Sequence, residues 1–133
     1  MVNQQKGINI TFWIAQVLLA AGLIWGGFMK LFQPIEKLSA MWPWAAQVPV
    51  ELLKLTGIID LFGAIGLILP SLLRIQPKLT PIAAVGVIIL MLSASVFHIM
   101  RGEASVIGVN IVFAIIAIFV AWGRFKKAPI ISK

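Results

Sequence analysis

Four long apolar runs constrain the fold of this chain more than any other feature of its sequence. They cover about residues 8–30, 52–70, 81–100 and 104–122 of the 133-residue chain. A helix rises 1.5 Å per residue, so a run of about 20 residues matches the roughly 30 Å of hydrocarbon in a bilayer. None of the runs alternates in polarity, as the strands of a membrane β-barrel do. We therefore expect an all-α protein in which residues 1–133 form a single domain, a four-helix transmembrane bundle with up-down-up-down topology.

The composition also indicates an integral membrane protein and limits its chemistry. Hydrophobic residues make up 61% of the chain, charged residues 11%, and the mean hydropathy is +1.05. A soluble domain is about a quarter charged, so this chain has too few polar side chains to cover a soluble globule. Cysteine is absent and there is one histidine, which excludes disulfides, iron–sulfur clusters and covalently attached haem. We predict no metal site and no intrinsic cofactor, so redox chemistry would need a borrowed cofactor such as a quinone, or a partner subunit.

Local signals mark the ends of the predicted helices. Pro70 follows the second apolar run, and Thr80-Pro81 is typical of an N-cap followed by proline at the first helical position. Residues 101–103 leave room only for a tight turn, so the third and fourth helices should be antiparallel neighbours.

Residues 31–50 form the one long connection between the predicted helices. Apolar residues spaced three apart over residues 34–41 predict a short amphipathic helix at the membrane interface. Trp42 and Trp44 follow it and are typical interfacial anchors. A plain loop carrying two interfacial tryptophans is the alternative.

The basic residues predict the orientation of the bundle. Eleven Lys and Arg against four Asp and Glu give a net charge of +7, but the basic residues stand at the ends of apolar runs and form no patch for nucleic acid. With four spans, both termini and the middle connection share one side, which holds seven basic residues and no acid. The positive-inside rule places that side, and so both termini, in the cytoplasm. The seven residues are Lys6, Arg74, Lys78, Arg124, Lys126, Lys127 and Lys133.

Polar residues of four segments are predicted to meet in the outer half of the membrane. Asp60 lies about eight residues into the second run, and a carboxylate at that depth is costly and usually functional. Lys30 ends the first run, His98 and Arg101 end the third, and Asn110 lies near the start of the fourth. The chain direction of each helix brings all five to one layer, together with Glu103. Each of the five lies on a helical stripe with small residues, which favours a position facing the bundle interior.

Each of these residues also has a simpler interpretation. Lys30 and Arg101 stand at span ends, where basic side chains often extend to the membrane surface. His98 could be an interfacial histidine bonded to a neighbour, and Asn110 could only join helices by a hydrogen bond. Asp60 could belong to a structural ion pair.

The order and spacing of several motifs resemble the DoxX-like family of small four-helix membrane proteins. The motifs are residues 26–32, 55–70, 79–81 and 98–103 together with Asn110, so the resemblance covers nearly the whole chain. It implies a four-helix bundle with its polar residues near one end. Family members commonly carry Glu where this chain has Asp60, a change that keeps the acid but shortens its reach. Some relatives are subunits of a thiosulfate:quinone oxidoreductase, and others assist the maturation of membrane or redox proteins.

We hypothesise a polar pocket in the outer half of the bundle that binds a lipophilic ligand such as a quinone, or that supports a membrane redox partner. Asp60 would be the anionic centre, with Lys30 and Arg101 pairing with it or binding an anionic or carbonyl group. His98 would relay a proton, because its charge changes near neutral pH, and Asn110 would orient a partner. We expect the protein in the cytoplasmic membrane of a bacterium.

Three alternatives stay open at this point. The protein could be an assembly factor or chaperone without a ligand. It could be a quinone-linked oxidoreductase subunit, with His98 and Asp60 as proton donors. The polar layer could also serve only to lock the bundle. Whether the chain is an enzyme, which protein partner it has and whether it forms a homo-oligomer are not determined by the sequence.

Overall fold

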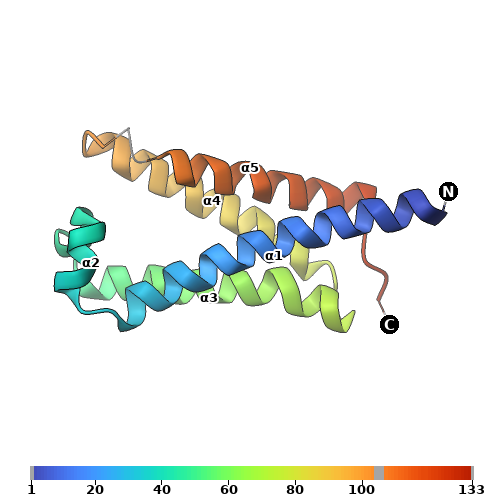
Figure 1. Ribbon diagram of the computed structural model, residues 1–133, viewed down its shortest axis with the longest axis horizontal. Coiled ribbons are helices and arrows are strands. Elements are labelled where there is room, and N and C mark those ends of the chain that lie inside the picture. Colours follow the sequence, from blue (N-terminus) through green and yellow to red (C-terminus); the bar gives the residue numbers. More distant parts are fainter. Residues whose placement is uncertain (1, 104–106, 133) are drawn as a thin grey trace.

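The computed structural model describes residues 2–103 and 107–132, and this part of the chain contains helices and no strand (Figure 1). Four helices are long and apolar enough to cross a membrane. This confirms the prediction of an all-α four-helix membrane bundle. The long helices are α1 (Val2–Phe32), α3 (Val50–Leu73), α4 (Leu79–Met100) and α5 (Gly108–Trp122). The shorter ones are α2 (Ile35–Met41), the 3-10 turn η1 (Pro43–Ala46) and the π-helical turn η3 (Gly123–Lys127), which extends α5.

The long helices run up and down along one axis, with α1 packed on α3 and α4 packed on α5 (Figure 1). The two pairs join where α3 meets α4 and where α1 meets α5. Both termini lie at one end of the bundle, which we call the terminal end, and α2 lies at the other, which we call the α2 end (Figure 1). Residues 104–106, where the fourth helix was predicted to begin, lie outside the described residues.

The short helix predicted in the first connection is present as α2, so the plain-loop alternative is wrong. Its Leu38 is fully buried and packs with Ala45 and Leu53 in a small core separate from the main one. Trp42 and Trp44 pack against this small core. The first connection is therefore a folded cap over the α2 end.

The helix boundaries near Pro70 differ from the sequence prediction, and hydrogen bonding explains the difference. Helix α3 continues through Pro70 and ends at Leu73. Proline has no N–H, so it leaves the carbonyl of Gly66, four residues earlier, without its helical partner. The hydroxyl of Thr80 donates to that carbonyl at 3.2 Å and lies 2.7 Å from the hydroxyl of Ser71. Thr80 thus lies inside the first turn of α4 and bonds to α3, and it does not cap its own helix.

The core of the bundle is made of a narrow stripe from each helix. Leu19 of α1, Leu67 of α3, Val87 of α4 and Ala117 of α5 are among its buried residues. The outward faces carry large apolar side chains as well, such as Phe62, which is 68% exposed. Water would disfavour an apolar surface of this extent, whereas hydrocarbon would not. The chain is therefore an integral membrane protein whose outer surface contacts lipid.

Glycine brings α1 and α3 into close contact. A methyl group added at Gly27 would lie 2.9 Å from the carbonyl oxygen of Gly57, and one added at Gly57 would lie 3.2 Å from the carbonyl oxygen of Gly27. The two backbones therefore touch, and no larger residue fits between them. Small residues at contacting faces are how membrane helices pack closely.

We expect Gly27→Ala to destabilise the bundle by about 1–3 kcal/mol, because the new methyl group would overlap a backbone oxygen that cannot move aside. Thermal unfolding in mild detergent, followed by circular dichroism, measures the effect. Gly86→Ala is the matched control, since a methyl group there meets no atom within 4 Å. An equal loss of stability in both variants would contradict the close contact between α1 and α3.

Candidate functional site

Lys30 and Asp60 form an ion pair between α1 and α3. The Lys30 Nζ atom lies 2.9 Å from Asp60 Oδ2. The Asp60 side chain is 5% exposed and that of Lys30 is 16% exposed, so both charges are largely removed from solvent and lipid. A methyl group on Gly57 would lie 3.0 Å from Lys30 Cβ, and one on Gly26 would lie 3.6 Å from Asp60 Oδ2. The ion pair is therefore held between glycine-rich faces of the two helices.

The ion pair of Lys30 and Asp60 presents little net charge to another molecule. Among residues 2–103 and 107–132, Lys30 provides the only hydrogen bond to the carboxylate of Asp60. Two opposite charges at 2.9 Å neutralise each other, which makes a charged residue tolerable inside a membrane bundle. The pair can fix α1 against α3. It can bind an additional polar group only through Lys30, whose side chain is partly exposed.

A second polar cluster lies at the end of α4, around Glu103. Oε1 of Glu103 is 3.0 Å from His98 Nδ1 and accepts a hydrogen bond from Arg101 Nε, also at 3.0 Å. The hydrogen bond from His98, followed by that from Arg101, lowers the pKa of Glu103 below its usual value of 4.5. Glu103 is thus a carboxylate at neutral pH and can only accept. It follows that Nδ1 of His98 carries the proton and that Nε2 is the ring nitrogen available to another partner.

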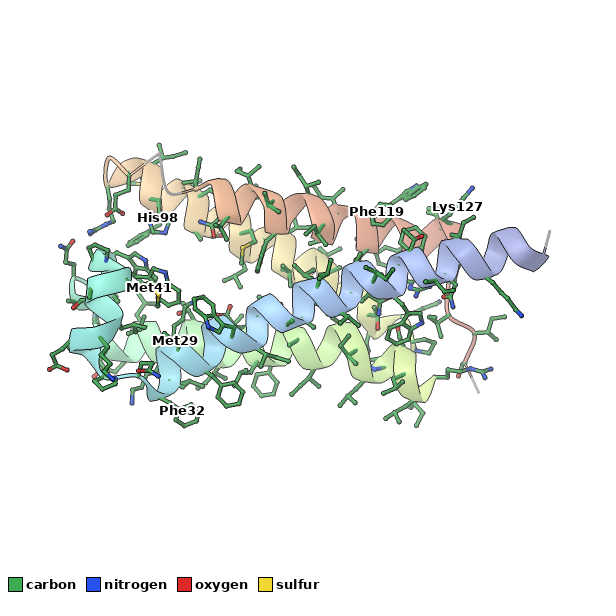
Figure 2. The ribbon with its side chains drawn as sticks, viewed as in Figure 1. Met29, Phe32, Met41, His98, Phe119 and Lys127 are labelled. Atoms are coloured by element: carbon green, nitrogen blue, oxygen red, sulfur yellow. The ribbon has the colours of Figure 1, made fainter. Side chains whose placement is uncertain are left out.

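The first connection contacts this cluster directly. Arg101 Nη2 also donates a hydrogen bond to Gln47 Oε1. The ring of Trp44 lies edge-on to His98, with 5.9 Å between the ring centroids. From Trp44 a row of aromatic rings continues through Trp42, at 6.3 Å, to Trp25 of α1, at 5.6 Å from Trp42. This aromatic row links α4 to α1 across the α2 end, where Figure 2 shows His98 and Met41.

The five residues predicted from the sequence fall into separate groups. Lys30 and Asp60 are paired, and His98 and Arg101 share Glu103. No hydrogen bond or ion pair joins these two groups in the part of the chain that the structure describes. Asn110 lies half-buried in the first turn of α5, and its side chain makes no hydrogen bond to any described residue.

An apolar groove of about 540 Å³ runs along α1 near the α2 end. Its walls include Trp25, Phe28, Met29 and Phe32, and Figure 2 shows the last two at this end of α1. None of the five predicted site residues lines the groove. Trp25 belongs both to the groove and to the aromatic row, so it connects the groove to the surroundings of His98.

Sequence reasoning missed a buried polar cluster at the terminal end. Arg124 donates from Nε to Gln16 Oε1 at 2.6 Å and from Nη1 to Asn9 Oδ1 at 2.7 Å. Gln16, fully buried, donates in turn to the carbonyl of Leu67 at 2.7 Å. The available signal was Gln16 itself, a polar residue in the middle of the first apolar run. From the sequence alone, Arg124 is only one of the seven basic residues that predict the orientation.

The comparisons with known proteins identify the family. The sequence matches the DoxX-like family over residues 14–120, a range that contains all five predicted site residues. No curated protein and no solved structure matches the chain. The chain belongs to the DoxX-like family, as its motifs indicated.

We expect Asp60→Asn to destabilise the protein by about 3 kcal/mol, because the change leaves the charge of Lys30 buried without its partner. The double variant Lys30→Met/Asp60→Asn removes both charges and should regain much of the loss. Thermal unfolding in detergent measures both variants. Glu51→Gln is the matched control, an exposed acid on the same helix. If the double variant is less stable than Asp60→Asn alone, Lys30 and Asp60 do not act as a pair.

The Glu103 cluster should make stability depend on pH in the acidic range. Because the folded protein lowers the pKa of Glu103, its carboxylate form is stabilising. That contribution is complete above the ordinary pKa of 4.5 and disappears as the pH falls through the lower pKa of the folded state. The melting temperatures of wild type and Glu103→Gln should therefore differ above pH 4.5 and converge on acidification. A constant difference across this range would contradict the assigned hydrogen bonds.

Proposed function

We propose that this DoxX-like membrane protein binds a lipophilic molecule with a polar carbonyl or hydroxyl head group, such as a quinone, at the α2 end. His98 is the residue proposed to contact the head group. The observation that carries the proposal is the geometry of this imidazole. Its Nδ1 is held by Glu103 at 3.0 Å, while its Nε2 makes no hydrogen bond to any residue of 2–103 or 107–132.

The two protonation states of His98 suit both forms of such a ligand. A neutral imidazole with its proton on Nδ1 accepts a hydrogen bond at Nε2, as a quinol hydroxyl requires. An imidazolium donates from Nε2, as a quinone carbonyl requires. Glu103 stays bonded to Nδ1 in either state. One nitrogen could thus bind the oxidised and the reduced ligand, and pass one of the two protons that accompany the two electrons when quinone and quinol interconvert.

The apolar surfaces near His98 suit the rest of a lipophilic ligand. The groove on α1 is open along one side and falls in the range of about 300–1,000 Å³ that is common for small-molecule sites. Its walls of Trp25, Phe28 and Phe32 would pack against a hydrocarbon tail. The aromatic row that begins at Trp25 offers ring faces and edges from the groove to His98.

The other predicted site residues take supporting roles in this proposal. Arg101 binds Glu103 and so holds the acceptor that orients His98. Lys30 and Asp60 fix α1, which carries the groove, against α3. Asn110 supplies an amide for a second hydrogen bond to the head group. The chain has no cysteine, so we propose that electrons exchanged with a bound quinone come from a partner protein in the same membrane.

Mass spectrometry of small molecules extracted from protein purified in mild detergent tests this proposal. We expect the wild type to retain about one quinone-type lipid per chain and His98→Gln to lose most of it, because a Gln amide cannot become a cation and cannot replace both ring nitrogens, one bonded to Glu103 and one to the head group. Glu103→Gln should lose an intermediate share of the bound lipid, because this change keeps the imidazole of His98 but removes its anionic partner.

Glu36→Gln is the matched control, because Glu36 lies exposed on α2, at the same end as Glu103. It should retain the ligand as the wild type does. Circular dichroism must show that each variant keeps its helices. If folded wild type and folded His98→Gln carry the same extracted lipids, the proposal is wrong, and the assembly-factor interpretation becomes the one to test by partner capture.

A further inference from the structure

Arg124 carries a buried positive charge, and its hydrogen-bond partners within residues 2–103 and 107–132 include no carboxylate. Only 3% of the surface of Arg124 is exposed. Its hydrogen bonds go to neutral acceptors, namely the amide oxygens of Gln16 and Asn9 and the carbonyl of Ala128 at 2.8 Å. Nη2 has only a 3.5 Å contact to the backbone oxygen of Asn9, at the limit of a hydrogen bond. A buried guanidinium normally has a carboxylate or phosphate partner.

The chain has no acidic residue to offer at this end. Glu36, Glu51 and Glu103 lie at the α2 end, and Asp60 is paired with Lys30. The terminal end carries basic residues instead, in the turn after α3 and in η3. No acidic side chain of the described residues therefore serves Arg124, and an anion from outside the protein could take that place.

A cavity of about 380 Å³ lies beside Arg124. One wall is the turn between α3 and α4, with Lys78, and the other is the C-terminal segment, with Phe125 and Pro129. Hydrogen bonds hold the walls together, since Arg74 Nε donates to the carbonyl of Ile131 at 3.0 Å. Figure 1 shows the C-terminal segment passing from α5 toward the end of α3. The cavity thus combines two cations with apolar surface, at the end of a bundle that lies in lipid.

We propose that this cavity binds the phosphate of an anionic membrane lipid, with Lys78 and Arg124 as its cationic ligands. A phosphate can accept hydrogen bonds from a guanidinium and an ammonium together. Phe125 and Pro129 would contact the glycerol and the upper acyl chains. Basic pockets at the ends of transmembrane helices are suited to anionic lipid head groups. The site is independent of the ligand proposed near His98.

Native mass spectrometry of the full chain in detergent, with added phosphatidylglycerol or phosphatidylcholine, tests the proposal. We expect wild type to retain one phosphatidylglycerol per chain and to discriminate against phosphatidylcholine. Lys78→Gln should weaken phosphatidylglycerol binding about fivefold, the loss expected for one lysine contact with an anionic head group. Lys78 is exposed, so this variant should fold. Lys126→Gln is the matched control, an exposed lysine at the same end that does not line the cavity, and it should bind as the wild type does.

Two results would overturn the proposal. Equal weakening by Lys78→Gln and Lys126→Gln would show general attraction to a basic surface without a site. A rise in melting temperature produced by inorganic phosphate alone, equal to that produced by phosphatidylglycerol, would show a site for soluble phosphate and not for lipid.

Discussion

A polar group inside hydrocarbon finds no water, so the bundle must provide its partner from within the chain. Lys30 provides it for Asp60, Thr80 for the carbonyl of Gly66, and Gln16 for the carbonyl of Leu67. Each of these bonds joins two different long helices. The need to satisfy buried polar groups therefore also fixes which helices are neighbours and at what height they meet. Apolar packing alone would define both less well, because the apolar surfaces of the helices are similar.

The positions of the long helices could be predicted from the sequence because hydrocarbon thickness sets the length of an apolar run. The behaviour of Pro70 could not be predicted in the same way. A proline ends a helix when the carbonyl that it leaves free has no partner, and it is tolerated when a neighbouring helix supplies one. Here Thr80 is that partner, and its role depends on how α3 and α4 pack. From its neighbours in the sequence alone, the same threonine is predicted to cap the N-terminus of α4.

The candidate site, too, could be predicted from the sequence only in part. Depth in the membrane follows from position along each run, so the contact between Lys30 and Asp60 could be anticipated. Depth does not give the direction in which a side chain points around the bundle. That is why His98 and Arg101, at the end of α4, bond to Glu103 rather than to Asp60. Arg124 was overlooked for a related reason, because the π-helical turn η3 buries a residue that its position at a span end would leave exposed.

The uneven distribution of charge has a consequence for the whole molecule. Four basic residues (Lys30, Lys37, Lys54 and Arg101) balance the four acids in the α2 half, so the net charge of +7 comes from the remaining seven basic residues. Six of these lie at the terminal end, and the seventh, Lys133, is outside the described residues. The protein is thus an electric dipole aligned with its helices. A membrane potential acts on each charge with about 2.3 kcal/mol per 100 mV, so the two possible orientations of this bundle differ in energy in an energised membrane.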